Sequence, residues 1–117
     1  MLQSSMFTPE SSWTVPAVFP QFSDTETIAI DLETYDPHLM TCGPGWATGR
    51  GHVVGVGVAT ENWKGYFPIR HKGGGNLDEG LVLRWLTNML SSTKREVIFH
   101  NALYDVGWLR REGIIVQ

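Results

Sequence analysis

Three acidic residues stand where they could do chemistry together. Asp31 and Glu33 lie two positions apart in a run where apolar residues alternate with them, which is the pattern of a strand. Side chains two apart on a strand project from the same face, so the two carboxylates sit side by side. Two adjacent anions repel each other, and carboxylate oxygens suit a compensating Mg²⁺ or Mn²⁺ ion. An isolated Asp-x-Glu triplet is, however, more often a solvated strand end.

Asp105 belongs to a second motif, H-N-A-L-Y-D, in which a short apolar run ends and a helical pattern begins. Asn101 and Asp105 are four positions apart and therefore share one face of the predicted helix. Functional groups gather at the carboxyl ends of parallel strands, so we expect Asp105 to join Asp31 and Glu33. Both residues also have ordinary structural explanations, because Asn is a good helix cap and the helix dipole favours Asp in a first turn.

The elements that must position these residues follow from hydrophobic spacing and turn chemistry. Asn76, with Glu79 three positions later, is a variant of the capping box and predicts the start of a helix. The glycine-rich residues 43–51 predict a flexible loop, and residues 96–100 predict a buried, parallel strand. In chain order the predicted elements are a strand from residue 28, strands over 53–59 and 63–70, a helix over 77–90, a strand over 96–100 and a helix over 101–112.

This order predicts an α/β fold with three antiparallel strands followed by a helix, a parallel strand and a helix. Residues 1–24 mix Ser, Thr and Pro and predict an irregular N-terminal arm, while residues 25–117 form the domain. The chain has 117 residues, 42% of them hydrophobic, which is enough for one small core. The net charge of −3 excludes binding of nucleic acid through overall electrostatic attraction. Any contact with nucleic acid must therefore be local.

Taken together, the motifs resemble those of a known superfamily. D-L-E-T, from Asp31 to Thr34, is similar to the first motif of the DEDD (DnaQ-like) 3′-to-5′ exonucleases, and N-A-L-Y-D, from Asn101 to Asp105, is similar to their second. The intervening Y-F-P-I-R-H resembles a hairpin strand in the proofreading domains of family A DNA polymerases, especially phage ones. The resemblance covers roughly residues 26 to 116, in the order the family would give.

The resemblance implies a ribonuclease H-like fold and two-metal hydrolysis of the 3′-terminal phosphodiester of single-stranded DNA. By motif position, Asp31 would bridge two Mg²⁺ or Mn²⁺ ions, Glu33 would bind the water-activating ion, and Asp105 would hold the second. Thr34 and Asn101 would help to seat the terminal nucleotide. One ion would lower the pKa of a water, and the other would stabilise the leaving oxygen.

The sequence departs from the family pattern because the third motif, a Tyr or His followed four residues later by Asp, should lie beyond Gln117. We therefore expect an incomplete site that binds metal weakly and hydrolyses DNA poorly unless the remainder of a polymerase is present. Two alternatives stay open: a stand-alone exoribonuclease of the same superfamily, and a non-catalytic module that binds nucleic acid or a polymerase.

The expected compartment is the cytoplasm of a bacterium or phage-infected cell. The opening residues lack the pattern of an export signal, and the single cysteine, Cys42, cannot form an internal disulfide. No run of about 18 apolar residues occurs, so we also expect no membrane partner.

Overall fold

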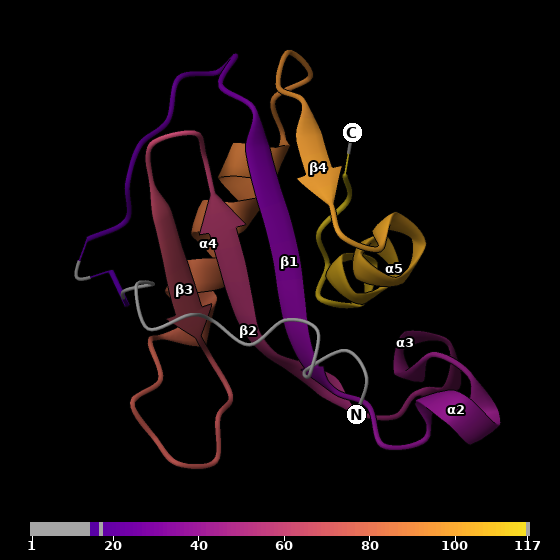
Figure 1. Ribbon diagram of the computed structural model, residues 1–117. Coiled ribbons are helices and arrows are strands. Elements are labelled where there is room, and N and C mark those ends of the chain that lie inside the picture. Colours follow the sequence, from indigo (N-terminus) through magenta and orange to yellow (C-terminus); the bar gives the residue numbers. More distant parts are fainter. Residues whose placement is uncertain (1–14, 17, 117) are drawn as a thin grey trace.

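A computed structural model describes residues 15, 16 and 18–116 as a four-stranded sheet with helices (Figure 1). The strand order is β3-β2-β1-β4. Strand β1 pairs antiparallel with β2 and parallel with β4, while β2 pairs antiparallel with β3. The α/β class is confirmed. The elements are β1 (Ile28–Tyr35), α2 (Leu39–Cys42), α3 (Gly45–Thr48), β2 (His52–Ala59), β3 (Lys64–Pro68), α4 (Glu79–Leu90), β4 (Val97–Phe99) and α5 (Ala102–Arg111).

One face of the sheet carries the core. Alternate residues of β1 are buried, as the sequence pattern predicts, and Ile28, Ile30 and Leu32 are each 1% exposed or less. Side chains of both α4 and α5 join these residues in one cluster, including Leu86 and Trp108. The odd-numbered residues of β1, Asp31 and Glu33 among them, therefore project from the opposite face, which we call the outer face.

The segment predicted as a flexible loop, residues 43–51, instead contains the short helix α3, and the short helix α2 lies directly before it (Figure 1). The prediction was wrong because glycine here ends helices rather than loosening the chain. Gly43 and Gly49 are the C-caps of the two helices, and both have positive φ angles, 84° and 76°. The backbone N–H of Gly45 donates to Asp36 Oδ2 at 3.0 Å, which fixes the start of α3.

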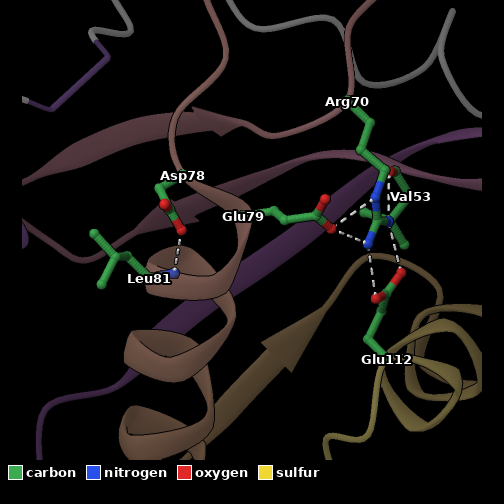
Figure 2. Close-up of polar contacts among 6 residues, drawn as sticks. All are labelled: Val53, Arg70, Asp78, Glu79, Leu81 and Glu112. Atoms are coloured by element: carbon green, nitrogen blue, oxygen red, sulfur yellow. Dashed lines mark hydrogen bonds and ion pairs between the residues drawn. The ribbon is translucent and has the colours of Figure 1, made fainter.

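Helix α4 begins two residues later than predicted, and its cap is a different residue. Asp78 is the N-cap, and its Oδ1 accepts the N–H of Leu81 at 3.0 Å (Figure 2). Asn76 caps nothing and instead exchanges two hydrogen bonds with the backbone of His71, at 2.7 and 2.8 Å. Asn and Asp both bond local backbone groups, so the spacing alone did not separate a turn residue from a cap.

Strand β4 is parallel to β1, as predicted, but it is not buried. It lies at the end of the strand order, and Ile98 is 52% exposed. Ile98 is paired with Ala29, so its side chain belongs to the outer face. A short apolar run therefore marks here an edge strand with one covered face rather than a strand covered on both.

Most of the predicted arm, residues 1–24, lies outside the described residues. Within its described part, the ring of Phe19 stacks on Phe67 and Trp85, with centroids 5.8 and 5.6 Å apart. Trp85 Nε1 donates to the carbonyl of Pro20 at 2.9 Å. This part of the arm thus packs against α4 and β3.

Arg70, just beyond β3, ties the two longer helices together (Figure 2). Its guanidinium donates to Glu79 at the start of α4 and forms two bonds, of 2.7 and 3.0 Å, with Glu112 at the end of α5. It also donates to the carbonyl of Val53 at 3.1 Å. The helices of the described part of the chain include none long and apolar enough to cross a membrane.

Candidate active site

Asp31 and Glu33 occupy neighbouring outer-face positions on β1, the strand between β2 and β4. In the pairing with β2, Asp31 lies opposite Gly57 and Glu33 opposite Gly55. Glycine has no side chain to cover its neighbour, which leaves space beside both carboxylates. A cavity of about 430 Å³ opens beside Asp31; its lining also includes Gly57, Ile98 and His100.

Asp105 reaches the same region from the first turn of α5. Strand β4 runs parallel to β1 and leads directly into this helix. Asp105 therefore lies near Asp31. The residue is fully buried, and its Oδ2 accepts the backbone N–H of Asn101 at 3.4 Å. Burial raises the pKa of Asp105 to about 7; the Asn101 hydrogen bond lowers it, and the negative charge of Asp31 raises it further.

Asp31 is in a similar state, half-buried and short of partners. Burial raises the pKa of its carboxyl, against the opposing effects of His100 and of the Leu32 backbone N–H. The Oδ1 atoms of Asp31 and Asp105 are both buried, and neither accepts a hydrogen bond from the described residues. Two buried, unsatisfied carboxylate oxygens close enough to influence each other's titration fit a shared cation.

Glu33 stands apart from this pair because other side chains hold it. The hydroxyl of Tyr66 donates to Glu33 Oε2 at 3.0 Å, and His71 Nε2 lies 2.5 Å from the same hydroxyl. Burial and the charge of Glu33 raise the pKa of Tyr66, so the phenol keeps its proton. Within residues 15, 16 and 18–116, no three His, Cys, Asp or Glu side chains cluster closely enough to hold a metal ion.

The two predicted nucleotide-seating residues lie in contrasting environments. Thr34 is only 4% exposed, and its hydroxyl lies 3.1 Å from that of Tyr104 inside the core. Asn101 is the N-cap of α5, yet its side chain makes no capping hydrogen bond and the residue is exposed. Its side-chain amide is therefore accessible. Contact of either residue with a nucleotide stays a prediction.

Sequence reasoning missed two groups of functional or supporting residues. Tyr66 and His71 were visible in Y-F-P-I-R-H but received no role, because Glu33, the partner of Tyr66, is 33 positions away, and His71 contacts Tyr66 rather than Glu33. Asp36 was missed altogether. It is 1% exposed and accepts hydrogen bonds from the Tyr104 hydroxyl, at 2.7 Å, and from Gly45. An isolated Asp that precedes a single proline, Pro37, gives no signal of such burial.

Comparison with known proteins gives one informative match. No protein-family model matches the chain. A DNA-directed DNA polymerase of Pseudomonas phage M6 is 38% identical over 120 aligned residues, which cover 97% of this chain and 18% of that polymerase. The chain is similar to a segment of a phage DNA polymerase. It spans less than a fifth of the length of that relative.

This match supports a polymerase-related domain of a nucleic-acid-processing protein. It agrees in general terms with the predicted phage polymerase and DNA partner. The match does not identify the reaction of this chain, so the exonuclease prediction depends on the acidic site.

Proposed function

We propose that this chain is the N-terminal portion of a 3′-to-5′ proofreading exonuclease domain with a ribonuclease H-like fold, acting on single-stranded DNA ends. The observation that carries the proposal is the approach of Asp31 and Asp105, which are 74 positions apart. Each presents a buried oxygen with no hydrogen-bond partner among the described residues, in the region where β4 ends beside the middle of β1. The similarity to a phage polymerase segment supports the polymerase-related part of the proposal.

In this proposal each residue of the site has a distinct role. Asp31 and Asp105 hold divalent cations, and Glu33, held by Tyr66, completes the carboxylate set from the side of β3. Bound Mg²⁺ or Mn²⁺ would supply an activated water and stabilise the leaving 3′ oxygen. The exposed amide of Asn101 is placed to donate to a phosphate or sugar. The buried Thr34 supports β1 through Tyr104.

Metal binding and DNA hydrolysis test the proposal together. Titration of the chain with Mn²⁺, followed by calorimetry, should show binding that Asp31→Asn and Asp105→Asn each weaken by about tenfold or more, because each removes a ligand charge. Asp24→Asn, a change at an exposed acidic residue, is the matched control and should bind as the wild type does. Binding that survives both site substitutions would contradict the proposal.

Labelled oligonucleotides separate the alternatives. A 5′-labelled single-stranded DNA should be shortened slowly from its 3′ end in the presence of Mn²⁺, and not at all by Asp31→Asn. Preferential shortening of RNA would favour a stand-alone exoribonuclease. Carboxylate-independent binding of DNA without any shortening would favour a non-catalytic module.

A further inference from the structure

Glu33 is held by a directed chain of hydrogen bonds. Tyr66 has one hydroxyl proton, and it is donated to Glu33 Oε2 at 3.0 Å. The bond between that hydroxyl and His71, at 2.5 Å, must then have the imidazole Nε2–H as its donor. The order of donation is therefore His71 to Tyr66 to Glu33.

Tyr66 reaches Glu33 because Gly55 leaves room for it. Gly55 is the β2 partner of Glu33, and a Cβ atom built on Gly55 would lie 1.9 Å from the Tyr66 hydroxyl oxygen. The tyrosine is 7% exposed, so the hydroxyl is shielded from competing water. The space left by the absent side chain of Gly55 is thus filled by the Tyr66 hydroxyl, which donates to the carboxylate of Glu33.

His71 is fixed in turn by the loop that follows β3. The side chain of Asn76 accepts the His71 N–H and donates to the His71 carbonyl, which closes the loop through Gly73, Gly74 and Gly75. The imidazole meets the Tyr66 ring edge-on, at an interplanar angle of 75° and a centroid distance of 5.6 Å. The donor at the start of this series, His71, is therefore fixed by contacts outside the acidic site.

We propose that Tyr66 and His71 are positioning residues that fix the carboxylate of Glu33, with Oε2 occupied and Oε1 left for a divalent cation. The proposal rests on the proposed function, because it assigns Glu33 to the metal site. A carboxylate already held in one rotamer loses less conformational entropy when it binds an ion. No hydrogen bond from the described residues occupies Oε1.

Mn²⁺ affinity, measured by calorimetry on the 117-residue chain, tests this role. Tyr66→Phe removes the donor and keeps the ring, and it should weaken Mn²⁺ binding by about tenfold, the lower end of the effect typical of groups that support a metal ligand. Tyr35→Phe, at a half-exposed tyrosine of β1, is the matched control and should not weaken binding. Thermal unfolding of each variant checks that it is folded.

A pair of substitutions at His71 separates the contribution of its hydrogen bond to Tyr66 from that of simple packing. His71→Gln places an N–H donor near the position of Nε2 and should retain Mn²⁺ affinity. His71→Asn is one methylene shorter, cannot reach the Tyr66 hydroxyl, and should resemble Tyr66→Phe. Equal affinities of the Gln and Asn variants would show that a hydrogen bond from position 71 to Tyr66 does not support Mn²⁺ binding, which would overturn the positioning role of His71.

The imidazole tautomer gives a readout that requires no metal. Nitrogen NMR of the wild type should show neutral His71 protonated at Nε2, and Tyr66→Phe should remove that preference. If Mn²⁺ binding depends on Asp31 and Asp105 but not on Tyr66 or His71, the positioning role fails and the proposed function stands. If the chain binds no Mn²⁺, or binds it independently of Asp31 and Asp105, the proposed function fails, and the positioning role fails with it.

Discussion

At the scale of single residues, Asp105 of α5 is buried with little polar compensation. Asp105 is fully buried, receives one hydrogen bond of 3.4 Å, and feels the charge of Asp31. A structural aspartate normally gains more than this. Asp36 is equally inaccessible, and its Oδ2 accepts bonds from Tyr104 and Gly45, whereas its Oδ1, like that of Asp105, accepts none from the described residues. Asp105 thus has fewer and longer hydrogen bonds than Asp36, which fits the metal-binding role proposed for it.

The pKa of Asp105, raised from 3.8 to about 7, predicts how the metal-free protein responds to pH. Between these values the folded protein holds the proton and the unfolded chain does not. The free energy of unfolding should therefore fall as pH rises from about 4 to about 7, and stay low above that. Asp105→Asn removes this penalty.

Asp105→Asn should thus stabilise the metal-free chain at about pH 8 by a few kcal/mol, because one pKa unit corresponds to about 1.4 kcal/mol. At about pH 4 the variant and the wild type should be equally stable. Urea unfolding across this range measures the difference, with Asp24→Asn as the control. A pH dependence identical in wild type and Asp105→Asn would show that the buried carboxyl does not titrate as inferred.

At the scale of elements, alternation along β1 was predictable and polar partners were not. Ile28, Ile30 and Leu32 face the core as their spacing requires, and that spacing alone put Asp31 and Glu33 on the other face. The cap of α4 was misassigned because Asn76 and Asp78 offer the same chemistry two positions apart. Periodicity fixes which way a side chain points, whereas the choice between nearby backbone donors depends on the folded loop.

The ion pairs of Arg70 with Glu79 and Glu112 predict how α4 and α5 are held together. The side chains of Arg70 and Glu112 are 24% and 16% exposed, whereas that of Glu79 is 52% exposed. Arg70→Met leaves Glu112 partly buried without its partner and should cost about 1 to 3 kcal/mol. Glu79→Gln removes an exposed pair and should cost less than about 1 kcal/mol.

Urea unfolding measures both costs, and Arg84→Met, at an exposed arginine of α4, is the control for removing a positive charge. Added salt should reduce the effect of Glu79→Gln more than that of Arg70→Met, because exposed pairs are screened more completely. If Arg70→Met lowers the free energy of unfolding no more than Arg84→Met does, the ion pairs of Arg70 are not needed for stability. In that case the helices would be held by the core alone.

At the scale of the whole molecule, the surplus negative charge is concentrated at the proposed site. The chain has 12 acidic and 9 basic residues. Without Asp31, Glu33 and Asp105 the acidic count is 12 − 3 = 9, equal to the basic count. Arg70 is also committed to Glu79 and Glu112, which removes it from the cations that could contact a phosphate. Under the proposed function, single-stranded DNA is therefore attracted locally, and the acidic site repels it until cations bind.

Binding of a labelled single-stranded DNA, followed by fluorescence anisotropy, should accordingly be weak without divalent cations and tighter with Mn²⁺. The slope of log affinity against log salt should be small, about −2 or shallower, because few phosphates are contacted. The double variant Asp31→Asn/Asp105→Asn moves the formal net charge from −3 to −1. It should bind DNA more tightly than the wild type without metal, and Mn²⁺ should add little.

The double variant Asp24→Asn/Glu61→Gln carries the same net charge of −1, since −3 + 2 = −1, but removes exposed carboxylates elsewhere. Local repulsion predicts that this control behaves like the wild type, both without metal and in its response to Mn²⁺. Bulk repulsion predicts instead that the two double variants bind DNA equally well. Equal affinities would therefore show that the placement of Asp31 and Asp105, as opposed to their charge, has no bearing on how this molecule meets a DNA strand.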